Sequence, residues 1–159
     1  MKKIGGILVV FLIAIMFVNV FPSSANAASP TTKTVTSKYG KGLGQTFSMQ
    51  QNNGLILKIY AYYNVDANGV TITSVSLKTV DVAFPFSVET SKPKILVAST
   101  KGTKQTAKAY GDFRTYILKA WKLGQAYQTT DRLNINFKVD KIDTKKKTVT
   151  YKVIGTSEK

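Results

Sequence analysis

The chain contains neither cysteine nor histidine, and these two absences exclude several kinds of chemistry. Disulfide bonds cannot form, so stability has to come from a buried core. A Ser-His-Asp triad, a Cys-His pair and an ordinary zinc site are excluded as well, because each needs one of the missing residues. No glycine-rich phosphate loop occurs either. The sequence therefore predicts a protein without enzymatic activity, cofactor or metal.

A pair of carboxylates, as used by glycosidases, is the catalytic arrangement that these absences leave open. Eight acidic side chains could contribute to one: Asp66, Asp81, Glu89, Asp112, Asp131, Asp140, Asp143 and Glu158. Most of them lie beside turns or lysines, where a solvated charge or a turn cap explains them. We interpret the neighbours Asp131 and Arg132, and the close pair Asp112 and Arg114, as local ion pairs.

Arginine is scarce too, since Arg114 and Arg132 are the only two among 23 basic residues, against eight acidic residues. Two of the lysines precede residue 28, so residues 28–159 hold 21 basic residues and a formal charge of +13. Lysine is a hydrated point charge that suits diffuse attraction to polyanions. Candidate partners are an anionic wall polymer, a membrane surface or extracellular nucleic acid. A second interpretation is that the charge only keeps the protein soluble.

The first 27 residues have the three parts of a secretory signal peptide. Two lysines precede an apolar run from Ile7 to Val18, and Ala25-Asn26-Ala27 supplies small residues for the signal peptidase. A membrane anchor is the alternative, but Ile7–Phe21 is only 15 residues long, and a spanning helix needs about 20. We expect cleavage before Ala28 and a secreted, extracellular protein, either free or retained non-covalently at the cell wall.

Residues 28–159 are enough for one domain with a sizeable core. Export without cysteine is unusual for eukaryotic domains, which cross oxidising compartments, and it suggests a Gram-positive source. Residues 28–43 are rich in Thr, Ser, Lys and Gly, and we expect a flexible lead-in with at most an edge strand at Lys33–Tyr39. We expect residues 44–159 to form the folded domain.

The strongest pattern predicts a hairpin between Leu55 and Val82. Apolar residues alternate from Leu55 to Val65, which is typical of a strand with one face in a core. Asn68-Gly69 readily forms a tight turn, and Val70–Val82 returns as the second strand. The apolar phase of the returning strand shifts between Ile72 and Val75, which predicts a bulge.

A second hairpin is predicted near the C-terminus, with alternation in Leu133–Val139 and Val149–Val153 around a polar turn at Asp143–Lys146. Lys94–Ser99 is typical of a short strand, followed by a turn at Lys101-Gly102. In residues 112–124 the apolar spacing is helical, but the residue types favour a strand, which we prefer. These patterns predict an all-β fold, an antiparallel β-sandwich or open barrel of about seven to nine strands.

Two groups of residues are candidate binding sites. The second hairpin carries lysines that could contact successive phosphates: Lys138, Lys141, Lys145, Lys146, Lys147 and Lys152. A solvated turn that discourages aggregation would explain the same lysines. Lys58, Tyr60 and Tyr62 lie on the polar face of the first predicted strand, where the rings could stack on sugars or bases. If both faces of that strand are buried, the tyrosines belong to the core or its rim instead.

Taken together, the sequence predicts a small secreted, non-enzymatic bacterial protein that associates electrostatically with anionic cell-envelope polymers or another polyanion. The alternative is a bacteriocin-like or membrane-active antagonistic protein. Residues 112–124 are the only segment that could supply an amphipathic helix for that alternative. The sequence indicates neither the ligand nor the oligomeric state.

Overall fold

A computed structural model describes residues 29–51, 54–117 and 128–159, so the expected signal peptide lies outside the described residues. This part of the chain forms nine strands and no helix. The strands are β1 (Thr31–Lys38), β2 (Gly40–Gln50), β3 (Ile56–Asp66), β4 (Gly69–Val80), β5 (Phe86–Thr90), β6 (Lys94–Val97), β7 (Thr106–Ile117), β8 (Gln128–Asp143) and β9 (Thr148–Glu158). No helix that could cross a membrane occurs among these residues.

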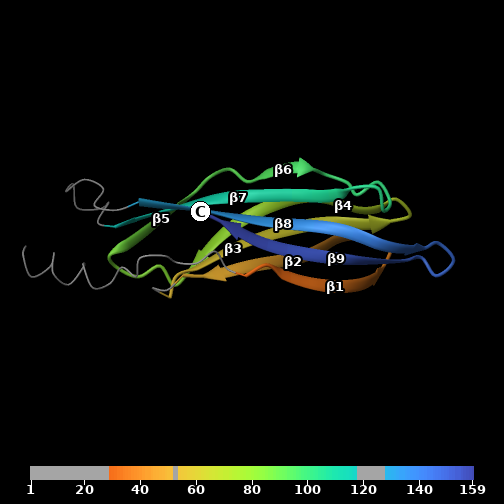
Figure 1. The fold of residues 1–159 in the computed structure, drawn as a ribbon, viewed down its shortest axis with the longest axis horizontal. Helices are drawn as coiled ribbons and strands as arrows, with labels where there is room; N and C mark the ends of the chain where they lie inside the picture. The colour runs from red at the N-terminus through yellow and green to blue at the C-terminus, as the bar shows by residue number, and fades with distance from the viewer. Residues whose placement is uncertain (1–28, 52–53, 118–127) are drawn as a thin grey trace, which may run out of the picture.

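The strands form two antiparallel sheets that stack as layers (Figure 1). The larger sheet has the order β1-β9-β8-β7-β5, and β6 also pairs with β7. The smaller sheet has the order β2-β3-β4. The chain passes from the larger sheet to the smaller one at Tyr39, between β1 and β2. The predicted all-β sandwich is therefore confirmed.

Alternating apolar residues from both sheets fill the space between them. In β3, every second residue from Leu57 to Val65 is buried, and the same holds from Leu133 to Val139 in β8. The centre is aromatic, because the ring of Tyr63 lies 4.7 Å from Phe137 and 5.9 Å from Tyr151. The hydroxyl oxygens of Tyr63 and Tyr151 are 2.8 Å apart and share a hydrogen bond. Burial is the main cause that raises the pKa of Tyr63, and the hydrogen bond with Tyr151 raises it further.

Two glycines of the larger sheet receive large side chains from the smaller one. A Cβ atom on Gly155 of β9 would overlap the ring of Phe47, and one on Gly111 of β7 would overlap the side chain of Leu77. Glycine inside a strand often marks a place where another group approaches closely. At these two positions the sheets therefore pack too closely for any side chain larger than that of glycine.

Both predicted hairpins are present. The β3–β4 loop consists of Ala67 and Asn68, while Gly69 begins β4 with a φ of +97°. The register of β3 and β4 shifts between Tyr62 and Tyr63, which pair with Ser74 and Ile72, so the predicted bulge is confirmed. The β8–β9 turn spans residues 144–147, close to the predicted Asp143–Lys146.

Strands also form near the N-terminus of the described chain, at Lys94–Val97 and in the segment whose residue pattern was ambiguous. Residues 31–38 form β1 at the edge of the larger sheet, close to the edge strand expected at Lys33–Tyr39. The threonines of β1 favour a strand although they bury little apolar surface. Residues 40–50 form β2, so the rest of the expected lead-in is also mostly strand. Residues 112–117 belong to β7, as the residue types predicted, and the rest of 112–124 lies outside the described residues. The predicted short strand at Lys94–Ser99 is β6.

Candidate functional site

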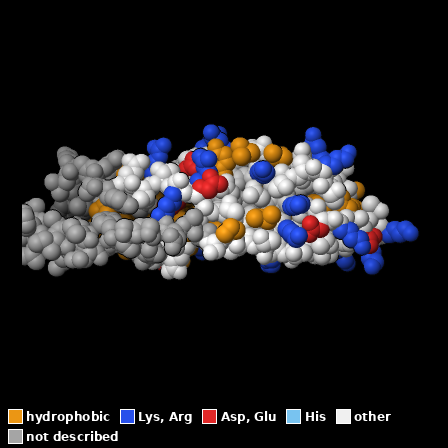
Figure 2. Space-filling view, viewed as in Figure 1, with side chains coloured by type: hydrophobic (Ala, Val, Ile, Leu, Met, Phe, Trp, Pro, Cys, Tyr) orange, Lys and Arg blue, Asp and Glu red, His pale blue; other side chains and the backbone are white. Residues whose placement is uncertain are grey.

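One end of the sandwich gathers lysines from several segments. The β8–β9 turn, the β3–β4 loop, the loop of residues 98–105 and the β1–β2 junction all lie at this end. The backbone N–H of Tyr39 donates to the carbonyl oxygen of Lys147 at 2.9 Å, which joins the junction to the turn. We call the following exposed lysines the basic end: Lys38, Lys41, Lys101, Lys104, Lys141, Lys145, Lys146 and Lys147. Figure 2 shows basic side chains projecting where the β8–β9 hairpin ends.

Three acidic residues lie at the same end, and each makes a local contact. The carboxylate of Asp66 accepts a hydrogen bond from the N–H of Asn68 at 2.6 Å, within the β3–β4 loop. Asp143 accepts from the N–H of Lys146 at 2.9 Å, within the β8–β9 turn. Asp140 lies 3.6 Å from the Nζ of Lys152, which is outside the basic end. Within the described residues, none of the eight lysines of the basic end therefore forms an ion pair.

The six lysines predicted from the second hairpin separate into two groups. Lys141, Lys145, Lys146 and Lys147 belong to the basic end. Lys138 and Lys152 pair directly across β8 and β9, on the outward face of the larger sheet. The bulge after Val139 separates the two groups, because Lys141 and not Asp140 pairs with Thr150.

Four lysines of the basic end were not predicted as candidates: Lys38, Lys41, Lys101 and Lys104. They come from three segments that are distant from the hairpin in the sequence. Their only signal was the predicted turn at Lys101-Gly102, which is present and has positive φ angles of 46° and 71°. The end of the sandwich at which that turn lies depends on how the strands are connected.

The second candidate group lies on the outward face of the smaller sheet. Lys58 and Tyr60 are half-buried there, and Tyr62 is 45% exposed. The alternate residues Leu57, Ile59 and Ala61 face the core. The structure therefore places these two tyrosines outside the core, on one face of the central strand.

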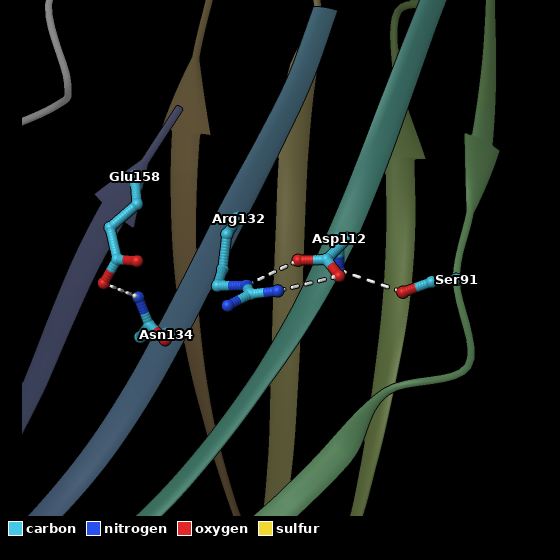
Figure 3. Close-up of polar contacts among 5 residues, drawn as sticks. All are labelled: Ser91, Asp112, Arg132, Asn134 and Glu158. Carbon is cyan, nitrogen blue, oxygen red and sulfur yellow. Dashed lines mark hydrogen bonds and ion pairs between the residues drawn. The ribbon is translucent and has the colours of Figure 1, made fainter.

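The acidic residues of the opposite half form pairs that differ from the expected ones (Figure 3). Asp112 pairs with Arg132 of the neighbouring strand, with its Oδ1 2.7 Å from Nε and its Oδ2 3.2 Å from Nη2. The guanidinium also lies 4.2 Å from the ring centre of Tyr110. Adjacent residues of a strand face opposite sides, so Asp131 and Arg132 point away from each other. Asp112 and Arg114 share a face of β7, but Arg132 lies directly opposite Asp112 on β8 and is closer to it than Arg114, which is two residues along the strand. Both local ion pairs expected from the sequence were wrong.

Asp131 faces the interior, with 4% of its surface exposed. Its carboxylate accepts a hydrogen bond from the Nε2 of Gln51 at 2.8 Å. Burial raises the pKa of Asp131, opposed by the charge of Lys159 and by the bond from Gln51. In the described segments, no three acidic side chains lie close enough to hold a metal ion. The arrangement indicates a structural contact between β8 and Gln51, the residue that follows β2.

No protein-family model matches the sequence, and neither the curated proteins nor the solved structures contain a match to the chain.

Proposed function

We propose that the chain is exported by a bacterium with a single membrane and that it binds an anionic polymer of the cell envelope without catalysing a reaction. The contact is electrostatic and is made by the basic end. The observation that carries this proposal is the gathering of eight exposed lysines from separate segments at one end of the sandwich. Flexible lysines on turns can follow a chain of phosphates without a fixed geometry.

The distribution of charge supports binding in addition to solubility. Charge that only keeps a protein soluble needs no particular location, and spreading it reduces self-repulsion. Here the nearby carboxylates contact backbone N–H groups of the turns or the ammonium group of Lys152 instead of the ammonium groups of the basic end. A polyanion is therefore the partner whose charge complements this surface.

The experiment uses residues 28–159, which contain every described strand, and inorganic polyphosphate as the probe. We expect the logarithm of the affinity to fall linearly with the logarithm of the salt concentration, because each contact releases counterions. Between about pH 5 and 8 the affinity should change little, since the chain has no histidine. Affinity that does not depend on salt would contradict the proposal.

The antagonistic alternative predicts a different result with anionic phospholipid vesicles. A membrane-active protein releases a trapped dye, whereas an electrostatic binder leaves the bilayer closed. The proposed amphipathic helix does not begin at residue 112, because residues 112–117 are strand. We expect salt-sensitive binding to the vesicles without leakage. Leakage at micromolar protein would favour the alternative.

A further inference from the structure

The outward face of the smaller sheet carries two lysines, two tyrosines and, on the flanking strands, the hydroxyl groups of serine and threonine. On the central strand β3, Lys58, Tyr60 and Tyr62 follow one another at every second position. Their partners on β2 are Ser48, Thr46 and Gly44, and their partners on β4 are Lys78, Ser76 and Ser74. We call these nine residues the tyrosine face. From Lys58 to Tyr62 it extends about 14 Å, at about 3.4 Å per residue.

Lys58 and Lys78 lie directly opposite each other across β3 and β4. Like charges in this position repel, because the Cβ atoms are only about 5 Å apart. No acidic residue occurs in residues 43–50, 55–65 or 70–80, which make up almost all of this sheet. Among the described residues, neither lysine forms an ion pair that would offset the repulsion. A bound anion would relieve it.

Tyr62 is held in an exposed position. The ring lies beside Gly44, where a Cβ would be 3.8 Å from Cε1 and 3.9 Å from Cδ1. Because Gly44 has no side chain, nothing from that position stands over the ring. The pairing is irregular on both sides, between Gly40 and Leu43 on β2 and beside Thr73 on β4. Bulges commonly re-aim a side chain, and here they flank an aromatic ring that is 45% exposed.

We infer that the tyrosine face is a binding site for an anionic polysaccharide. Lys58 and Lys78 hold a negatively charged group of the polymer, and Tyr60 and Tyr62 pack against sugar rings. The hydroxyl groups of Ser and Thr both donate and accept hydrogen bonds, as the hydroxyls of a sugar do. Arginine, which stacks on bases and grips phosphates through two parallel bonds, is absent from the described residues of this sheet. A sugar polymer therefore suits the face better than a nucleic acid does.

This site is separate from the basic end, and it would stand if the basic end bound nothing. The two surfaces bind ligands with different chemical properties. The basic end requires only dense negative charge, whereas the tyrosine face requires charge together with sugar rings. Variants at the two places should therefore respond differently to two polyanions, one with sugars and one without.

The test compares dextran sulfate with inorganic polyphosphate, using residues 28–159 in which Lys145, Lys146 and Lys147 are already changed to Gln. In this background, Tyr62→Ala should weaken binding of dextran sulfate about 5- to 10-fold, the lower range for loss of one stacking ring. Binding of polyphosphate should stay within about twofold. Tyr62→Phe keeps the ring and should bind dextran sulfate like the parent.

The lysine pair has its own matched control. Lys78→Gln should weaken binding of dextran sulfate more than Lys94→Gln does, since Lys94 is exposed on the larger sheet. The inference is overturned if Tyr62→Ala leaves dextran sulfate binding unchanged or weakens both polymers equally. It is also overturned if oligothymidylate binds as tightly as dextran sulfate and with the same dependence on Tyr62, because the face would then recognise single-stranded nucleic acid.

Discussion

Changing Lys145, Lys146 and Lys147 together to Gln should weaken binding to polyphosphate roughly 10- to 100-fold at low salt. The three lysines occupy the β8–β9 turn, are exposed and form no ion pair within the described residues. Each phosphate contact contributes about −0.7 to −0.9 to the slope of log affinity against log salt. The slope should therefore become shallower by about two to three. Titration of a labelled polyphosphate at several salt concentrations measures both quantities.

The matched control removes the same charge elsewhere. Lys33, Lys92 and Lys94 are also exposed, but they lie away from the β8–β9 turn. Changing these three to Gln lowers the net charge equally and should reduce the affinity only a few-fold, with little change in slope. Equal losses from the two triple variants would mean that only net charge matters, and the basic end would then have no special role.

Replacing Gly155 with Val should destabilise the fold by about 3 kcal/mol, the upper part of the usual range for overpacking a core. The new side chain would occupy the space of the Phe47 ring, which is 6% exposed and has little room to move. Either the ring leaves its place or the two sheets separate slightly. Urea denaturation of residues 28–159 gives the change in the free energy of unfolding.

A compensating substitution distinguishes this clash from a general intolerance of side chains in β9. Phe47→Leu replaces the ring with a smaller side chain. In that background Gly155→Val should lower the free energy of unfolding less than it does in the wild type, by about 1 kcal/mol or more. Gly44→Val serves as the control for stability. That glycine is exposed, and its Cβ would meet only the Tyr62 ring at ordinary contact distance. An unfolding midpoint unchanged by Gly155→Val would refute the proposed packing.

Much of the fold could be predicted because its strands show their burial in the sequence. The alternation from Leu55 to Val65 reflects one face in the core, and the phase shift after Ile72 is the bulge itself. The polar residues at 143–146 marked the second turn. Within the lead-in expected over 28–43, the edge strand expected at Lys33–Tyr39 is β1, but the start of β2 at Gly40, at an edge of the smaller sheet, was not predicted. An edge strand that packs few apolar side chains lacks the alternation that identifies a buried one.

The candidate sites were less accessible to prediction because they depend on connections between distant segments. The hairpin lysines were visible as a run, but Lys38 and Lys101 join them only through the strand order. The pairing of Lys58 with Lys78 requires the register of β3 and β4, which the bulge shifts by one residue. The ion pair of Asp112 with Arg132 likewise depends on the register of β7 and β8, because the register determines which charged residues lie opposite each other.

Mapping the contact residue by residue tests the central claim most directly. In a titration of residues 28–159 with polyphosphate, backbone amide chemical shifts report which segments meet the ligand. We expect the largest changes at residues 38–42, 101–104 and 141–147, with small changes around Asp112 and Glu158. Changes spread evenly over the surface, or concentrated at the opposite end of the sandwich, would contradict binding through the basic end.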